Sequence, residues 1–175
     1  MMRIFLVAFL SFCFLVTSCK REKVSEVTEV TQQQKEDNTI TQKDIESLRY
    51  DDYGLSADSQ KAVTDWQRFQ DLNIQTEVLK NGDLSYFSGD PLLITTLMQE
   101  MKGQMPKQLR SNEILARITA LDTKIQKLNS LLRIDNISKQ EKLQAIKEYL
   151  ITVSNLNLQM NKKFEFEKNN ILKPE

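Results

Sequence analysis

Histidine is absent from the chain, and glycine, proline and cysteine are scarce. Because histidine is the usual general base near neutral pH and the commonest metal ligand, its absence excludes Ser-His-Asp and Cys-His nucleophilic systems. The two cysteines, Cys13 and Cys19, lie inside or at the edge of an N-terminal apolar run. A body that begins after Cys19 therefore holds no thiol, no disulfide and no Cys/His metal cluster.

Four glycines and three prolines in 175 residues leave few positions for the tight turns that sheets require. Abundant Lys, Glu, Gln, Leu and Ile favour long helices instead. Lys and Arg number 24 and Asp and Glu also 24, so no global basic field attracts nucleic acid. Lys107, Arg110 and Arg117 form a weak basic cluster without interleaved aromatic residues, and we expect no nucleic-acid partner.

No motif of established chemistry is recognisable in the chain. We find no glycine-rich phosphate loop, no Glu-x-x-His pair and no calcium-loop spacing. Carboxylates on the expected helices interleave with lysines, as in Glu141-Lys142 and Lys147-Glu148, which is typical of a solvated face. We therefore expect no catalytic residues, no cofactor and no metal, and a protein that is not an enzyme.

The N-terminus has the pattern of a secretory signal. A short basic start, Met1-Met2-Arg3, precedes an almost wholly apolar run of about 13 residues from Ile4 to Val16. A helix that spans a bilayer needs roughly 20 apolar residues. A shorter run with a positive start and small residues at its end predicts a cleaved signal peptide over residues 1–18.

The stretch Val16-Thr17-Ser18-Cys19 resembles the lipobox of bacterial lipoproteins, an aliphatic residue and two small residues before an obligatory cysteine. The resemblance implies cleavage between Ser18 and Cys19 by signal peptidase II and acyl chains on Cys19. Cys13 is a poor competitor because bulky Phe12 precedes it. The alternatives are an ordinary secreted protein or a short membrane anchor with an incidental cysteine. Two or three acyl chains, at about 0.8 kcal/mol per buried CH₂, make a stable anchor.

The same resemblance bears on location, which we expect to be the bacterial cell envelope. In lipoproteins of some bacteria, an Asp directly after the lipidated cysteine is typical of retention in the inner membrane. Here that residue is Lys20. This favours the outer membrane, and the choice between its periplasmic and surface faces stays open.

Residues 19–54 are expected to be a lipidated flexible tether. Val24, Val27 and Val30 are the only apolar residues between Cys19 and Ile40, too few to offset the entropy lost on ordering. A flexible chain of about 30 residues has an end-to-end distance of roughly 30 Å. A short transient helix capped by Thr41 is compatible with this, and Tyr50-Asp51-Asp52-Tyr53 is either a recognition patch or a solvated linker end.

A first body helix is predicted from Ser56, as N-cap, to about Lys80. Its apolar stripe includes Trp66 and Phe69, which either pack in the core or stack on a ligand. Gly82 is the expected left-handed stop. Asp83 and Asp90, which flank Tyr86-Phe87, are candidates for acid/base work or for turn and cap roles.

Asp90-Pro91 predicts the start of a second helix over about 91–102, with aspartate as cap and proline as first residue. Apolar residues cover a wide arc of this helix, so we expect it to be central. Its methionines either fill core gaps or line a promiscuous groove.

Two heptad seams follow. In residues 112–132 the apolar positions are spaced 4, 3, 4, 3 and 4, and residues from Leu143 to Phe164 repeat the pattern. Ser138-Lys139-Gln140-Glu141 fits a capping box. Two seams joined by about five residues predict an antiparallel helical hairpin. Asn157, on the second seam, either fixes register or contacts a ligand.

We thus predict an all-α fold, a three- or four-helix bundle over residues 55–168 built on the antiparallel hairpin, with a frayed tail at 169–175. The body resembles small uncharacterised helical lipoproteins of Bacteroidetes-type bacteria. The expected function is a non-enzymatic interaction or structural module with a protein partner in the envelope and the membrane bound through Cys19. The alternatives are a carrier or chaperone holding a lipid or peptide between helices, and a carboxylate-dependent hydrolase.

Overall fold

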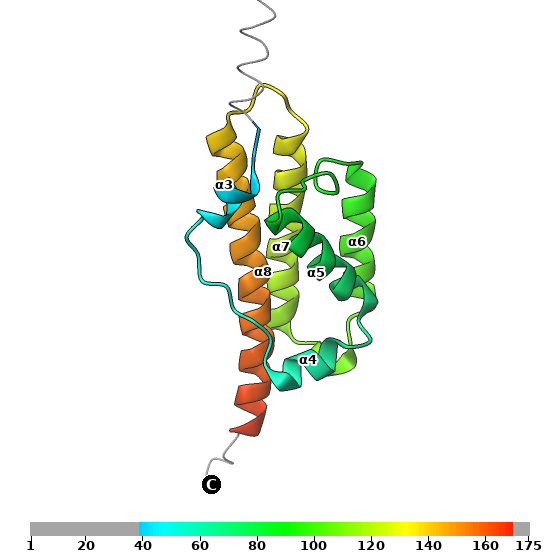
Figure 1. Cartoon of the computed structure of the whole chain (residues 1–175). Helices are drawn as coiled ribbons and strands as arrows, with labels where there is room; N and C mark the ends of the chain where they lie inside the picture. The colour runs from blue at the N-terminus through cyan, green and yellow to red at the C-terminus, as the bar shows by residue number, and fades with distance from the viewer. Residues whose placement is uncertain (1–38, 170–175) are drawn as a thin grey trace, which may run out of the picture. The chain divides into compact units, whose positions relative to one another are not determined.

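The computed structural model describes residues 39–169, and its contacts divide the chain into two units, residues 1–39 and 40–175. The second unit is all-helical, as predicted, and no strand occurs among the described residues. Six α-helices and one 3₁₀ turn follow in order (Figure 1): α3 (Gln42–Glu46), α4 (Ala57–Val63), α5 (Gln67–Lys80), α6 (Pro91–Gly103), η2 (Lys107–Leu109), α7 (Asn112–Leu132) and α8 (Lys139–Lys168).

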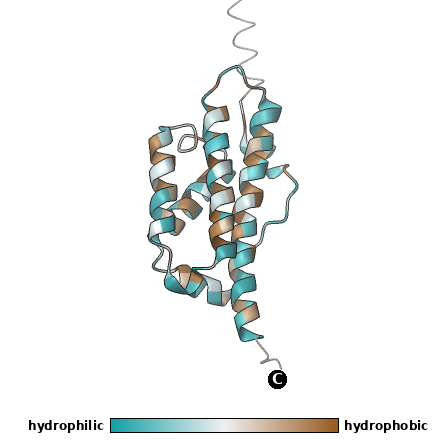
Figure 2. Ribbon diagram, turned by 180° about the vertical axis from the view of Figure 1, so that it is seen from behind, coloured by the Kyte–Doolittle hydropathy of each residue, from teal (hydrophilic) through white to brown (hydrophobic). Residues whose placement is uncertain are grey.

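The antiparallel hairpin of α7 and α8 is the centre of the fold, and its prediction is confirmed. Helix α7 has the predicted bounds, and the Ser138 hydroxyl accepts from the Glu141 amide at 3.3 Å to cap α8. The α7 seam is fully buried at Ile114, Ile118, Leu121, Ile125 and Leu128. Each such side chain contributes roughly 1.5–3 kcal/mol when removed from water. Figure 2 shows hydrophobic and hydrophilic residues alternating along both helices, as one buried face requires.

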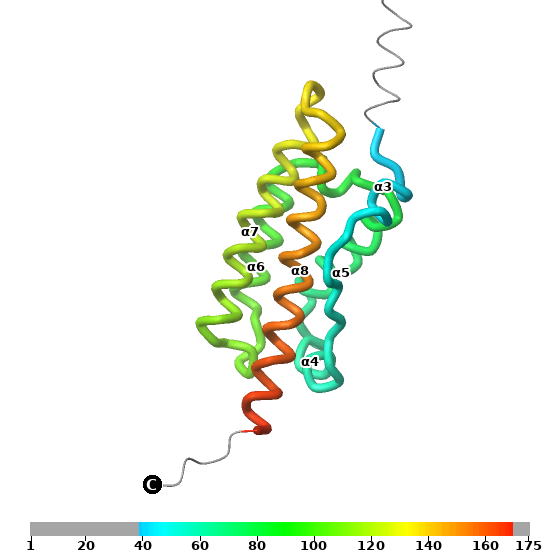
Figure 3. The backbone as a smooth tube through the Cα atoms, turned by 90° about the vertical axis from the view of Figure 1, so that its left-hand side faces the viewer, coloured from blue at the N-terminus to red at the C-terminus, as the bar shows by residue number. Residues whose placement is uncertain are grey.

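Helix α6 lies at the edge of the unit, so the prediction that it is central is wrong. It runs beside α7 and packs mainly on α7 and α5, while α5 lies obliquely across these helices (Figures 1 and 3). Only one face is therefore covered: Ile94, Leu97, Met98 and Met101 are buried there. Leu92 and Leu93, in the first turn of α6, lie outside this face and are 66% and 56% exposed. The two methionines fill core space, the first of the two roles considered for them.

The predicted helix from Ser56 to Lys80 is two helices, broken at Trp66. Ser56 does cap the first, α4, by accepting from the Ser59 amide. The indole of Trp66 is fully buried, stacks on Phe69 at 5.2 Å and donates to the Met101 carbonyl at 3.1 Å. The break lets the heaviest side chain turn into the core. At the break the Val63 carbonyl accepts from the Trp66 amide at 3.0 Å and from the Gln70 side chain at 2.8 Å. Trp66 and Phe69 thus have the core role.

Residues 40–56 form an ordered segment on α8, called here the strap, so the folded domain starts near residue 40 rather than 55. Ile40 and Ile45 are buried, and Thr41 caps α3 with a complete capping box. The extended part is held by hydrogen bonds to Ser154, Asn157 and Asn161, each between strap backbone and an α8 side chain. The expectation of a flexible chain over 19–54 is corrected for this part, because α8 supplies the partners that the strap's own composition lacks.

Asn157 therefore does not fix the register of the hairpin seam. Its amide donates to the Tyr53 carbonyl at 3.0 Å, so the side chain faces the strap rather than α7. Asp52 in the strap pairs with Lys80 at 2.9 Å, and Tyr50 is partly buried. The Tyr50–Tyr53 stretch is thus attached to the domain through these contacts and is not a linker end, although Asp51, Asp52 and Tyr53 are exposed.

Gly82 ends α5 in the left-handed conformation, with a φ of +92°, as predicted. The Gly82 amide donates to the Leu79 carbonyl and the Asp83 amide to the Val78 carbonyl, which is a Schellman motif. A Cβ at this position would lie 3.0 Å from the Gln42 backbone nitrogen. The glycine therefore serves both the turn and the close approach of α3.

Several predictions fall outside the described residues. These are the signal peptide over 1–18, the cleavage and lipidation site at Ser18 and Cys19, the first part of the tether, and the tail beyond Asn169.

Candidate interaction site

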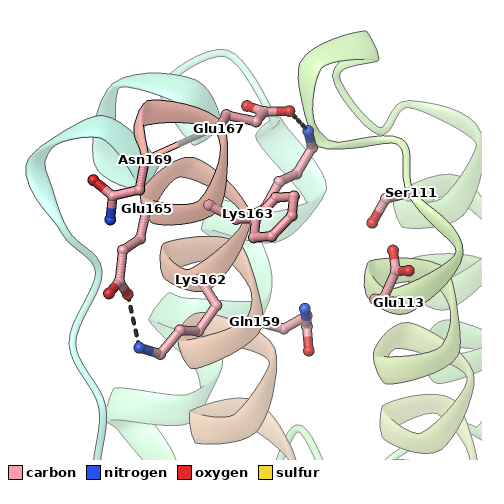
Figure 4. Close-up of a pocket in the computed structure, with 9 residues that line it drawn as sticks. Ser111, Glu113, Gln159, Lys162, Lys163, Glu165, Glu167 and Asn169 are labelled. Carbon is pink, nitrogen blue, oxygen red and sulfur yellow. Dashed lines mark hydrogen bonds and ion pairs between the residues drawn. The ribbon is translucent and has the colours of Figure 1, made fainter. Parts of the chain in front are cut away.

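Several surface hollows occur in the described unit, and one of them lies where the last turns of α8 pass the start of α7. It has a volume of about 610 Å³ and is lined from α8 by residues including Gln159, Lys162, Lys163 and Phe166, and from the start of α7 by Ser111 and Glu113 (Figure 4). Both lysines already pair along their own helix, Lys162 with Glu165 at 2.7 Å and Lys163 with Glu167. The hollow therefore offers one exposed aromatic ring, Phe166, two lysines that already pair with glutamates of α8, and the carboxylate of Glu113.

A second hollow, of about 460 Å³, is a groove between α5 and α6, called here the α5–α6 groove. Buried Leu97 and half-buried Tyr86 contribute to its lining. Ile74 of α5 and Leu92 and Leu93 of α6 border it and are 58%, 66% and 56% exposed. Three of the seven large exposed hydrophobic side chains in the described residues thus gather at this one groove, which singles it out as an interaction surface.

An ion-pair cluster spans one end of the groove. Arg68 of α5 lies between Asp71, 2.9 Å from Nη1 to Oδ2, and Glu100 of α6, 2.5 Å from Nε to Oε2. The carboxylates of Asp71 and Glu100 raise the pKa of Arg68 further. Hydrogen bonds from Gln67 and Arg68 lower the pKa of Asp71. Arg68 and Asp71 therefore stay charged over the physiological range, and Arg68 bridges the two helices.

The groove was not predicted from the sequence, although one signal was present. Ile74 lies off the buried stripe of α5, which includes Phe69, Leu72, Thr76 and Leu79. Leu92 and Leu93 likewise lie off the buried stripe of α6. Apolar residues that lie outside the buried stripe of a helix are candidates for a second, exposed apolar surface.

The loop between α5 and α6 does not have the arrangement of an acid/base site. Asp83 accepts from the Ser85 amide at 2.8 Å, and Asp90 caps α6 by accepting from the Leu92 amide at 2.9 Å. Phe87 is buried against Tyr149, with ring centroids 5.0 Å apart. Buried Asn129 on α7 donates to the carbonyls of Phe87 and Gly89 and so anchors the loop. These aspartates have the turn and cap roles that the sequence already offered for them.

The carboxylates with shifted pKa values are all shifted downward: Asp44, Asp71, Asp83, Glu113 and Glu148. A carboxylic acid that donates a proton near neutral pH needs a raised pKa instead. The hydrogen bond from Ser85 lowers the pKa of Asp83, for example, and keeps it ionised. Within residues 39–169 no three His, Cys, Asp or Glu side chains gather as a metal site would require.

No helix among the described residues has the length and hydrophobicity to cross a bilayer. Comparison with known proteins gave no match to a family model, a curated protein or a solved structure.

Proposed function

We propose that this chain is a lipid-anchored protein of the bacterial cell envelope whose helical domain binds a protein partner through the α5–α6 groove, without catalysing a reaction. The observation that carries the binding role is the cluster of Ile74, Leu92 and Leu93 on a domain whose other large apolar side chains are mostly buried. Exposing leucine and isoleucine side chains to water is unfavourable by roughly 25 cal/mol per Å², which a partner would recover.

The anchor rests on the sequence alone. Val16-Thr17-Ser18-Cys19 follows an apolar run that is too short to span a bilayer, and Lys20 favours the outer membrane. Because the folded domain starts near residue 40, the proposed tether shortens to about residues 20–39. A flexible chain of that length has an end-to-end distance of roughly 25 Å. The domain would thus work close to the membrane that anchors it.

The packing favours an interaction module over a carrier. A carrier needs an apolar cavity between its helices, but the facing residues of the hairpin, such as Ile118, Leu121, Ile125 and Ile146, are fully buried against other protein atoms. The observed hollows open at the surface, where they suit a protein partner. The downward pKa shifts of the carboxylates likewise give the hydrolase hypothesis no support.

The anchor is tested by labelling cells with an alkyne fatty acid and comparing Cys19→Ser with Cys13→Ser. We expect Cys19→Ser to lose the label and the detergent-phase partitioning, while Cys13→Ser keeps both. Retention of the label by Cys19→Ser, or its loss from Cys13→Ser alone, would refute the anchor.

The binding role is tested by placing a photocrosslinking amino acid at position 93 in the full chain, in its bacterial host. The matched control has the same amino acid at position 115, where Leu115 is 39% exposed on α7. We expect one crosslinked protein at position 93 that is missing at 115. Equal crosslinking at both positions, or none at 93, argues against the groove as the binding surface.

A further inference from the structure

The charge around the α5–α6 groove is unbalanced. Its lining holds one cation, Arg68, and two carboxylates, Asp71 and Glu100, which Arg68 contacts at the same time. Asp90 adds a further carboxylate at the other end of α6, directly before Pro91 and the exposed leucines. The nearby Lys102 does not compensate, because its ammonium group pairs with Asp122 of α7 at 2.7 Å. The exposed apolar side chains thus lie between Arg68 with its two carboxylates at one end and Asp90 at the other, and these groups together carry more negative than positive charge.

The dimensions of the groove match a short helix. The lining residues on α6 run from Leu92 to Glu100, a length of about 13 Å, which is the length of two to three turns of a partner helix. Two packed helices present a furrow in which a third can lie with its ridges in their grooves. Ile74 on one wall and Leu92 and Leu93 on the other are placed to contact apolar residues spaced three and four apart.

We infer that the α5–α6 groove binds an amphipathic helix of a partner protein, one that has Leu-like side chains on one face and Lys or Arg beside them. This inference rests on the proposed function and adds the chemistry of the partner. The apolar face of the helix covers Ile74, Leu92 and Leu93, and its cations lie near Glu100 and Asp71 at one end and Asp90 at the other. The same carboxylates repel acidic peptides and anionic lipid headgroups, which fixes the sign of the partner's charge.

The test measures the binding of two synthetic helical peptides by fluorescence anisotropy. Both are 15 residues long with leucines at positions i, i+3, i+4 and i+7, and one has lysines where the other has glutamates. The protein is the full chain in nanodiscs of zwitterionic phosphatidylcholine, and empty nanodiscs provide the blank. We expect the lysine peptide to bind at least tenfold more tightly than the glutamate peptide, and to weaken as salt is added.

Three variants locate the binding. Leu92→Ser combined with Leu93→Ser should weaken binding of the lysine peptide at least tenfold, because it removes the exposed apolar surface that the peptide would bury. Glu100→Gln should reduce the ratio between the affinities for the lysine peptide and the glutamate peptide. It removes one carboxylate and leaves the positive charge of Arg68 less neutralised. Leu115→Ser, on α7, should leave binding unchanged. Circular dichroism melting of each variant shows whether it is folded.

Equal binding of both peptides, or tighter binding of the glutamate peptide, overturns the inferred charge of the partner. If neither peptide binds, or if the α6 variants and Leu115→Ser lose affinity equally, the inference that a helix occupies the groove is wrong. A host protein crosslinked at position 93 but lacking a basic amphipathic helix would also overturn this inference, while leaving the proposed function intact. Lysine peptide retained by empty nanodiscs as strongly as by loaded ones assigns the signal to lipid and overturns it too.

Discussion

The hydroxyl groups of Thr76 and Tyr149 lie 2.6 Å apart in the core, although 73 positions separate the two residues in the sequence. Thr76 also lies 2.8 Å from the Leu72 carbonyl, to which its hydroxyl donates, so the Tyr149 hydroxyl donates to Thr76. Tyr149 is fully buried, and burial raises the pKa of its phenol. This chain of two hydrogen bonds joins α5 to α8 and satisfies the one polar atom of the largest side chain on the hairpin.

We expect Thr76→Val to destabilise the domain more than Tyr149→Phe does. The valine leaves a buried phenol O–H without an acceptor, which costs about 1–3 kcal/mol, whereas the phenylalanine removes the donor and leaves Thr76 bonded to Leu72. Urea denaturation of the two single variants and of the double variant measures this. The double variant should lose less than the sum of the single losses, and strict additivity would mean that the two hydroxyls do not interact.

Glu148 should make stability dependent on acid pH. Hydrogen bonds from Lys124 and Lys127 of α7, both at 2.9 Å, lower the pKa of Glu148 to about 2. A carboxyl whose pKa is depressed in the folded state contributes stability above its unfolded pKa, near 4.5, and loses it as the pH falls towards 2. The melting temperature of Glu148→Gln should therefore fall less than that of the wild type over this interval. Parallel pH profiles would show that the two lysine contacts contribute nothing.

Gly82→Ala should destabilise the domain by about 1–3 kcal/mol, the usual range for a non-glycine residue at a strained backbone angle. Its φ is +92°, and the new Cβ would meet the Gln42 backbone at 3.0 Å. Gly103→Ala is the matched control, because a Cβ there meets nothing within 4 Å and α6 is helical at that position. We expect the control to be neutral or slightly stabilising in thermal melts. An equal loss in both would point to helix ends in general rather than to Gly82.

Ser154→Ala should loosen the strap without unfolding the hairpin. The Ser154 hydroxyl accepts from the Tyr53 amide at 2.8 Å and donates to the Asp51 carbonyl at 2.5 Å. Losing both bonds should cost about 1–3 kcal/mol and speed hydrogen exchange at the Tyr53 amide. Ser130→Ala, at an exposed position of α7, should leave that exchange unchanged. Unchanged exchange in Ser154→Ala would mean that the strap is held by its other contacts alone.

Features that depend on near neighbours in the chain could be predicted from the sequence. The bounds of α7, the caps at Ser56, Asp90 and Ser138, and the stop at Gly82 were all predictable. Helix caps and heptads act over three to seven residues, so the residues that satisfy them are close in the sequence. The all-helical fold and its hairpin follow from these local signals.

Features that depend on residues far apart in the chain could be recognised only in the folded domain. The strap looked too polar to order because its partners, Ser154, Asn157 and Asn161, lie more than 100 residues away. The helix break at Trp66 depends on a core pocket and on the Met101 carbonyl, to which the indole donates. The α5–α6 groove exists because α6 is at the edge of the unit. The apolar pattern of a helix does not show which of its apolar residues the other helices will leave exposed. Local hydrogen bonding is encoded within a few residues, whereas burial depends on how all of the helices pack.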